Sequence, residues 1–365
     1  MRNWIAIGLL AMLPLAASAQ QPAGVPHPAT ESPSCAPSMG LTFICGLNQP
    51  EDLLQIGTSK WVIASSMGEG GGISLIDSDA KTARRFFTGA AAPDTKLYPD
   101  CAKVPENFNT HGLALRPAQV GGTYTLYAVT HAPFESIQVF AVDARGAMPA
   151  ISWTGCVRLP ADYRTNSVTA TRDGTILANV QMHGNATDFI SGNITGGVWE
   201  WKPVDKKLRL LPGTELAGNN GIEISPDETE FYIAVSGTQT VAVYSRANAA
   251  KPLRTIRTPF YNLDNIHWSG APNSQRLIAA GMMFDEPSCG GTRKQIQDAK
   301  GNMSCHRGWV ISQLDPKAMR WKILAYGEPN PSFGGIATGL VIGKTLWISS
   351  FQMDRVAYRP LPGVK

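Results

Sequence analysis

A short phrase that recurs six times along the chain limits the fold more than any other feature. In each copy, a polar residue or a glycine opens a run in which apolar residues alternate with others, as they do in a β-strand. The six copies begin at Glu51, His111, Asn166, Asn220, Asp264 and Gly335. Because repeats of this length with several β-runs each are typical of propeller blades, the pattern predicts six similar sheets.

Two of the repeats display four β-runs each, the number of strands in a propeller blade. These runs lie at 221–227, 230–235, 240–245 and 253–257, and at 112–115, 123–130, 137–142 and 151–158. Helical periodicity is almost absent, and the 36 Gly and 26 Pro residues suit many short elements joined by turns. We therefore predict an all-β, six-bladed β-propeller. A two-sheet sandwich is the alternative, disfavoured because the phrase recurs six times and because a propeller leaves only short sheet edges exposed.

The N-terminal segment predicts export. Arg2 precedes an apolar stretch and the small-residue motif Ala17-Ser18-Ala19, which together are typical of a signal peptide over residues 1–19. Residues 20–34 are expected to form a flexible leader, and residues 35–365 a single propeller domain. An uncleaved anchor is the alternative, but the apolar stretch is shorter than the ~20 residues that span a bilayer. We expect a periplasmic or secreted protein without a membrane span after cleavage.

The six cysteines all follow the predicted cleavage site. In an exported protein an even number of cysteines indicates disulfide bonds. Proximity along the chain favours the pairs Cys35–Cys45, Cys101–Cys156 and Cys289–Cys305. A zinc site is the alternative, but the sequence has no Cys-x-x-Cys pair and only Cys305 has a histidine beside it.

The residues that open the repeats form a candidate metal site. Inner strands of a propeller line one central channel, so the residues at their starts converge at one end of it. The polar members are Glu51, His111, Asn166, Asn220, Asp264 and Asn265. Two carboxylates and three amide oxygens favour Ca²⁺, which takes six to eight oxygen ligands, over zinc or copper. Each Asn or Asp alone is also a common turn residue. Their occurrence at the same point of successive repeats favours the metal site.

These residues and their surroundings resemble the calcium-dependent six-bladed propellers of the paraoxonase and gluconolactonase superfamily, and most closely the paraoxonases. The resemblance covers most of the chain after the leader, in order. The motifs that carry it are Pro50-Glu51-Asp52-Leu53, Thr110-His111-Gly112-Leu113, Thr130-His131-Ala132-Pro133, Thr165-Asn166-Ser167, Asn220-Gly221-Ile222 with Ser225-Pro226-Asp227, and Leu263-Asp264-Asn265-Ile266.

The resemblance implies one catalytic calcium, held by Glu51, Asn166, Asn220, Asp264 and Asn265. It also implies that Asp52 serves a second, structural calcium. Two departures from the paraoxonase pattern matter. Ser167 stands where paraoxonases have an aspartate that binds the second ion, and no cysteine lies near the C-terminus to join the two ends of the propeller. The second calcium is therefore in doubt, and ring closure is expected to rely on strand pairing.

The expected activity is hydrolysis of a small-molecule lactone or aryl ester. A channel calcium polarises the carbonyl, and His111 or His131, the pair implied by the resemblance, deprotonates water. Asp264 is the alternative base, and His183 and His267 are weaker candidates. A non-catalytic propeller that binds a partner is the alternative function, and non-hydrolytic chemistry like that of strictosidine synthase-like propellers is disfavoured because the metal ligands are present. A net charge of +4 without a basic run gives no support for nucleic-acid binding.

Overall fold

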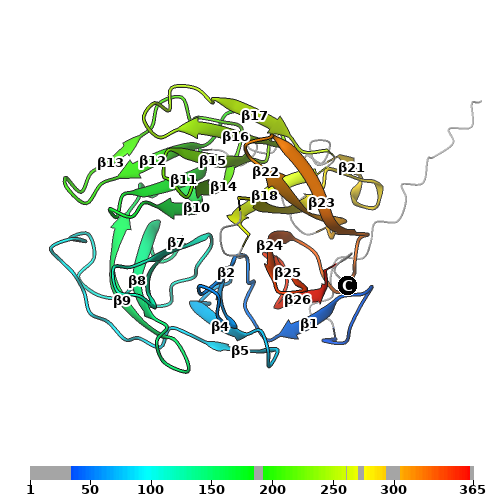
Figure 1. Ribbon diagram of the computed structural model, residues 1–365, viewed down its shortest axis with the longest axis horizontal. Coiled ribbons are helices and arrows are strands. Elements are labelled where there is room, and N and C mark those ends of the chain that lie inside the picture. The colour runs from blue at the N-terminus through cyan, green and yellow to red at the C-terminus, as the bar shows by residue number, and fades with distance from the viewer. Residues whose placement is uncertain (1–33, 185–191, 260, 270–274, 293–304, 362–365) are drawn as a thin grey trace, which may run out of the picture.

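The computed structural model describes residues 34–184, 192–259, 261–269, 275–292 and 305–361. Within these residues the chain forms six four-stranded antiparallel sheets around a central axis, which confirms the predicted all-β, six-bladed propeller (Figure 1). The one helical element in the described part is a single 3-10 turn, η1 (Pro287–Cys289). The predicted signal peptide and all but the last residue of the leader lie outside the described residues.

The first three blades follow the chain from the innermost strand to the outermost. Blade 1 consists of β2 (Leu53–Gln55), β3 (Trp61–Ser65), β4 (Ile73–Asp77) and β5 (Thr82–Arg85). Blade 2 consists of β6 (Leu113–Pro117), β7 (Thr123–Thr130), β8 (Ser136–Asp143) and β9 (Ala150–Arg158). Blade 3 consists of β10 (Tyr163–Ala170), β11 (Ile176–His183), β12 (Gly197–Trp201) and β13 (Leu208–Leu210).

The remaining blades keep this order, except that blade 5 contains an inserted hairpin and the outermost strand of blade 6 is β1. Blade 4 consists of β14 (Asn219–Ile224), β15 (Glu230–Val235), β16 (Thr240–Ser245) and β17 (Arg254–Arg257). Blade 5 consists of β18 (Tyr261–Trp268), β19 (Leu277–Met283), β22 (Trp309–Asp315) and β23 (Arg320–Gly327), and the small hairpin β20 (Asp285–Glu286) and β21 (Gly291–Thr292) is inserted in it. Blade 6 consists of β24 (Ile336–Ile342), β25 (Thr345–Ser350), β26 (Arg355–Pro360) and β1 (Thr42–Cys45).

Strand pairing closes the ring, as expected from the missing C-terminal cysteine. The N-terminal strand β1 pairs antiparallel with β26, from Thr42 opposite Tyr358 to Cys45 opposite Arg355. Figure 1 shows the blue β1 beside the red β26. The six inner strands contact one another in turn, and the last of them, β24, contacts the first, β2. The polar starts of these strands are thereby brought around one axis.

The hydrophobic core is divided among the six interfaces between neighbouring blades. Each interface holds one cluster of buried apolar side chains. In β15, for example, Phe231 and Ile233 pack toward blade 3, whereas Tyr232 and Ala234 pack toward blade 5. Full burial of a side chain such as Phe231 contributes about 1.5–3 kcal/mol relative to exposure. Because both faces of a middle strand are buried, apolar residues run continuously in it, while outer strands such as β5 are mostly exposed.

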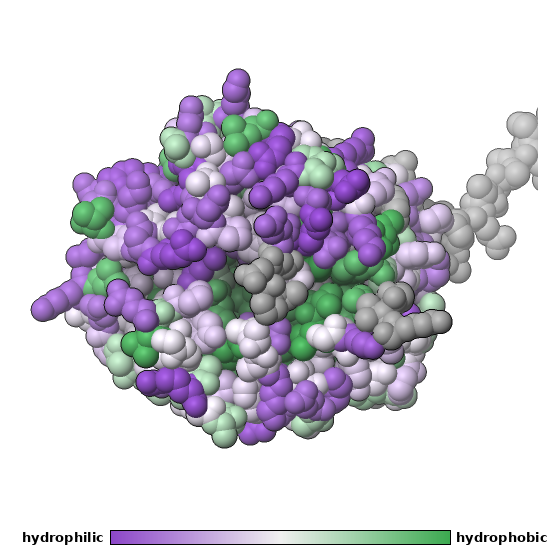
Figure 2. Space-filling view, in the orientation of Figure 1, coloured by the Kyte–Doolittle hydropathy of each residue, from purple (hydrophilic) through white to green (hydrophobic). Residues whose placement is uncertain are grey.

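The molecular surface differs between its periphery and its middle. Figure 2 shows hydrophilic side chains over most of the periphery and apolar side chains gathered near the middle of the visible face. Helices long and apolar enough to cross a membrane do not occur among the described residues.

All three cysteine pairings predicted from proximity are confirmed. The disulfides join Cys35 to Cys45, Cys101 to Cys156, and Cys289 to Cys305. The first anchors the N-terminal segment to β1, and the third spans the insertion of blade 5. Since disulfides persist in oxidising compartments, the three bonds indicate a location outside the cytoplasm.

Candidate metal centre and active site

β-bulges interrupt the inner strands at the residues predicted to bind the cation. The pairing with the next strand skips Asn166 in β10, Asn220 in β14, and both Asp264 and Asn265 in β18. A bulge leaves a residue outside the ladder and turns its side chain away from the regular alternation. The same local irregularity in three successive blades therefore releases the predicted ligands from their sheets.

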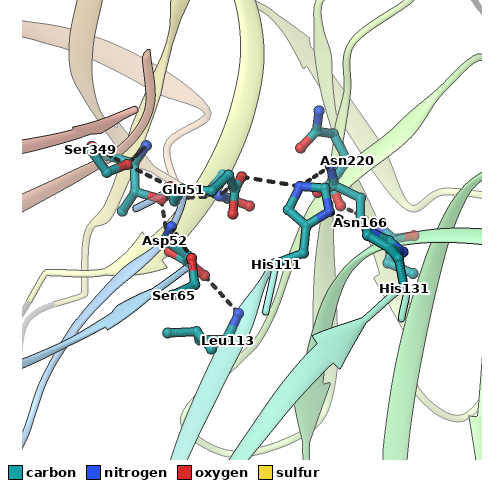
Figure 3. Close-up of polar contacts among 12 residues, drawn as sticks. Glu51, Asp52, Ser65, His111, Leu113, His131, Asn166, Asn220 and Ser349 are labelled. Carbon is teal, nitrogen blue, oxygen red and sulfur yellow. Dashed lines mark hydrogen bonds and ion pairs between the residues drawn. The ribbon is translucent and has the colours of Figure 1, made fainter. Parts of the chain in front are cut away.

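Contacts between blades show that the released side chains meet. The Asn265 Nδ2 group of blade 5 donates a hydrogen bond to Glu51 Oε1 of blade 1 at 2.6 Å. His111 of blade 2 places Nε2 3.5 Å from the same oxygen, and Asn166 Nδ2 of blade 3 lies 3.4 Å from that Nε2. Figure 3 shows Glu51 and His111 facing each other, with Asn166 and Asn220 beside the histidine.

Four buried oxygens of this group have no hydrogen-bond partner among the residues that the structure describes. They are Glu51 Oε2, Asn166 Oδ1, Asn220 Oδ1 and Asn265 Oδ1, each on a side chain no more than 5% exposed. Leaving buried acceptors unmatched costs about 1–3 kcal/mol for each group, so such clusters need a reason. A hard cation bound by these oxygens supplies that reason.

Hydrogen bonds to the amide nitrogens hold the free oxygens in their orientation. Asn220 Nδ2 donates to Ser236 Oγ at 3.0 Å, and this hydroxyl in turn donates to the carbonyl of Leu263 at 2.6 Å. Asn265 Nδ2 is bound by Glu51 and, at 3.0 Å, by Thr338 Oγ1. Since the NH₂ ends are occupied by acceptors, the oxygen ends are the ones left open.

The electrostatics of Glu51 also favour a cation. Burial, reinforced by the neighbouring Asp52 carboxylate, raises the pKa of Glu51 well above its ordinary value. A divalent ion beside Glu51 Oε2 would restore its charged form. Asp264, the second predicted carboxylate ligand, is half-buried, and its charge acts on the pKa of His111. The contacts therefore bring Glu51, Asn166 and Asn265 together around His111, with Asn220 beside the histidine, whereas Asp264 is linked to them only through the effect of its charge on His111.

The donor set is rich in amides. Among the residues that the structure describes, no three His, Cys, Asp or Glu side chains come together as a metal site. All six cysteines are bonded in disulfides, so the zinc alternative lacks its thiolate ligands. The residues present fit Ca²⁺, whose ligands include carboxylate and amide oxygens.

Two glycines let the inner strands approach closely enough to form the site. A Cβ atom on Gly112 would lie 2.5 Å from the carbonyl oxygen of Asn166, and one on Gly221 would lie 2.7 Å from the backbone nitrogen of Ile266. Both glycines directly follow a predicted site residue, His111 or Asn220. Their place in the sequence motifs is therefore explained by the narrow spacing between adjacent inner strands.

The two predicted catalytic histidines form a hydrogen-bonded pair beside the oxygens. His111 Nδ1 and His131 Nε2 are 2.8 Å apart. The other nitrogen of His131, Nδ1, is 2.8 Å from Glu135 Oε2, a buried carboxylate that the sequence motifs did not reveal. Burial lowers the pKa of His111 below its ordinary value despite nearby acidic groups. The available signal for Glu135 was an acidic residue four positions after His131 and directly before strand β8.

Asp52, implied to bind a second calcium, is fully engaged by the protein. Its Oδ1 accepts hydrogen bonds from Leu53 N at 2.8 Å, Thr338 Oγ1 at 2.7 Å and His267 Nε2 at 2.8 Å. Its Oδ2 accepts one from Leu113 N at 2.8 Å. Both oxygens of Asp52 thus accept hydrogen bonds from protein groups, and the residues present do not fit a second cation, because His267 lies against Oδ1 with a raised pKa that favours its positive form.

In place of a second ion, the imidazole of His267 lies between the carboxylates of Asp52 and Glu223. Its Nε2 contacts Asp52, and its Nδ1 lies 3.5 Å from Glu223 Oε2. Burial alone would lower the pKa of His267, but the two carboxylates outweigh that effect and raise the pKa to about 10. Arg116 Nη2 lies 3.2 Å from Glu223 Oε1 and completes the network. This places His267 among structural ion pairs, and not beside the predicted calcium ligands as a base.

The remaining candidate, His183, lies apart from the site contacts. It is exposed at the end of β11, with its ring near those of Tyr163 and Trp199. Within the described part of the chain, no hydrogen bond links it to the predicted ligands, whereas His111 contacts Glu51 and Asn166.

Comparisons with known proteins support the fold alone. No protein-family model and no curated protein sequence matches the chain. Among solved structures, a luciferin-regenerating enzyme is similar over 89% of this chain and 96% of its own, with a TM-score of 0.51 and 13% identity. The PQQ-bound aldose sugar dehydrogenase from Streptomyces coelicolor is similar over 91% of this chain and 99% of its own, with a TM-score of 0.47 and 11% identity. At these identities the chain is established as a six-bladed β-propeller similar in fold to a luciferin-regenerating enzyme.

Proposed function

We propose that this chain is an exported, calcium-dependent hydrolase of lactones or aryl esters. The observation that carries the proposal is the set of four unpartnered buried oxygens, two of which belong to Glu51 and Asn166, the side chains that contact His111 Nε2 through their other polar atoms. Oxygens of this kind suit Ca²⁺, and a histidine nitrogen next to them suits proton transfer from water. The three disulfides agree with a periplasmic or secreted location.

In this proposal Glu51, Asn166, Asn220, Asp264 and Asn265 hold one calcium ion. When bound, the ion polarises the carbonyl of the substrate and stabilises the oxyanion that develops on hydrolysis. His111 accepts the proton of the attacking water at Nε2. His131 holds His111 through the 2.8 Å contact at Nδ1 and keeps its ring directed at the ligand oxygens.

The proposal is tested by hydrolysis of a lactone panel and phenyl acetate. We expect turnover with calcium, loss of turnover after EGTA treatment, and recovery when calcium is restored. Magnesium should restore little activity, because it demands a smaller, near-octahedral site and sheds water reluctantly. A calcium-loaded protein that turns over none of these substrates would favour the alternative, a non-catalytic propeller that binds a partner.

His111→Gln is expected to lower kcat by at least about 100-fold, the lower range of general-base contributions. Calcium affinity should fall less than in Glu51→Gln, because His111 contacts two proposed ligands but is not one itself. His183→Gln is the matched control and should retain wild-type kinetics, because His183 is exposed and its ring lies edge-on to Trp199, away from the site contacts. Steady-state kinetics and calcium titration calorimetry measure both quantities. If His111→Gln stays within a few-fold of wild type, Asp264 becomes the candidate base.

A further inference from the structure

The hydrogen bonds of Glu135 continue the histidine pair into the protein interior. Glu135 directly precedes β8 and is only 2% exposed. Its Oε1 accepts a hydrogen bond from the backbone N–H of Thr165 at 2.6 Å, and its Oε2 is 2.8 Å from His131 Nδ1. The guanidinium of Arg164, which is half exposed, lies 4.0 Å from Oε2. Both carboxylate oxygens are thus directed at fixed partners.

These partners determine which nitrogens of the two histidines carry hydrogen. A carboxylate can only accept, so His131 must present N–H at Nδ1. In a neutral imidazole the other nitrogen is then an acceptor, so His131 Nε2 accepts from His111 Nδ1–H across their 2.8 Å contact. His111 Nε2 is left without hydrogen, and this atom lies 3.5 Å from Glu51 Oε1 at the proposed calcium site.

We propose that Glu135 is a positioning residue that sets the tautomers of His131 and His111, so that His111 Nε2 remains a proton acceptor beside the metal ligands. Glu135 touches neither substrate nor metal in this arrangement and acts through two imidazole rings. The proposal rests on the proposed hydrolase function for its kinetic consequence, but the tautomers themselves follow from the contacts alone.

Glu135→Gln is the sharpest test because it changes the direction of one hydrogen bond at nearly constant size. The backbone N–H of Thr165 requires an acceptor, so the amide oxygen takes the place of Oε1 and the NH₂ group faces His131. His131 Nδ1 must then accept, which puts hydrogen on His131 Nε2, and His111 in turn carries hydrogen on Nε2. The proton acceptor beside the calcium ligands is lost.

The first measurement is the ¹⁵N spectrum of the imidazole rings, recorded on calcium-loaded protein. We expect hydrogen on Nδ1 of both histidines in the wild type and on Nε2 of both in Glu135→Gln. Glu135→Asp, which keeps an acceptor, should retain the wild-type tautomers. Unchanged tautomers in Glu135→Gln would overturn the proposal whether or not the protein hydrolyses esters.

The second measurement is kinetic. Glu135→Gln should lower kcat by at least about 100-fold, as expected when a general base is held in the wrong tautomer. The KM, the calcium affinity and the melting temperature should remain close to wild type, and Glu135→Asp should recover part of kcat. A kcat within twofold of wild type would overturn the positioning role. Absence of turnover in the wild type would instead refute the hydrolase function and leave the tautomer result standing.

Discussion

Replacing Glu51 with glutamine is expected to weaken calcium binding at least about 100-fold and to abolish calcium-dependent hydrolysis, since even partners outside the ligand shell cost 10–100-fold. Glu51 and Asp264 carry the only two negative charges of the proposed ligand set. Charge count is a main determinant of calcium affinity, and amide oxygens alone bind the ion weakly. Titration calorimetry with calcium measures the affinity, and hydrolysis of phenyl acetate measures the activity.

The thermal stability of Glu51→Gln separates loss of the ion from loss of the fold. Without calcium, the variant should melt no lower than the wild type, because burial and Asp52 already disfavour the charged form of Glu51. Added calcium should raise the melting temperature of the wild type and not that of the variant. Glu230→Gln, at a partly exposed carboxylate paired with Arg254, is the control and should keep wild-type calcium affinity. Calcium affinity of Glu51→Gln within threefold of wild type would refute the proposed ligand set.

The fold could be predicted because each blade has a local sequence pattern that recurs along the chain. Each repeat opens with a polar residue or, in the sixth, a glycine, followed by alternating apolar residues, and the structure confirms an inner strand at or just after all six positions. The disulfides were predictable because each bond joins cysteines that are neighbours among the six along the chain. Ring closure by strand pairing was expected from the absence of a cysteine near the C-terminus, but the structure was needed to show that β1 and β26 are the strands that pair.

The sequence predicted only those candidate site residues that occupy equivalent positions in the repeats. Asn166, Asn220 and Asn265 occupy equivalent bulges, so their common phase in the sequence placed them together. Glu135 has no counterpart in the other blades, and its contact with His131 depends on how the loop between β7 and β8 folds. His267 was named as a weaker candidate base, since little of a motif surrounds it. Its side chain is instead directed at Asp52, a contact between blades 5 and 1 that no local pattern encodes.

We expect one calcium per chain, because His267 takes the place of the second ion that the resemblance to paraoxonases implies. The imidazole lies between Asp52 and Glu223, and every oxygen of Asp52 is already engaged by protein groups. Metal analysis of protein dialysed against a low concentration of calcium should yield a ratio near one. A ratio of two would show that a second ion competes successfully with these hydrogen bonds.

Replacing His267 with alanine should lower the free energy of unfolding by about 3–5 kcal/mol, the cost of removing one partner from a buried ion pair. The variant removes the imidazolium between Asp52 and Glu223. Of these two carboxylates, only Glu223 has another cation, Arg116, beside it. His306→Ala is the matched control, because His306 is equally buried but its Nδ1 contacts only the backbone carbonyl of Asn330, at 2.8 Å. Urea unfolding at saturating calcium measures both losses, and their difference isolates the charge pairing from the loss of a ring. Equal losses in the two variants would mean that His267 stabilises the channel by packing alone. The proposal that its imidazolium takes the place of a second calcium ion would then be refuted.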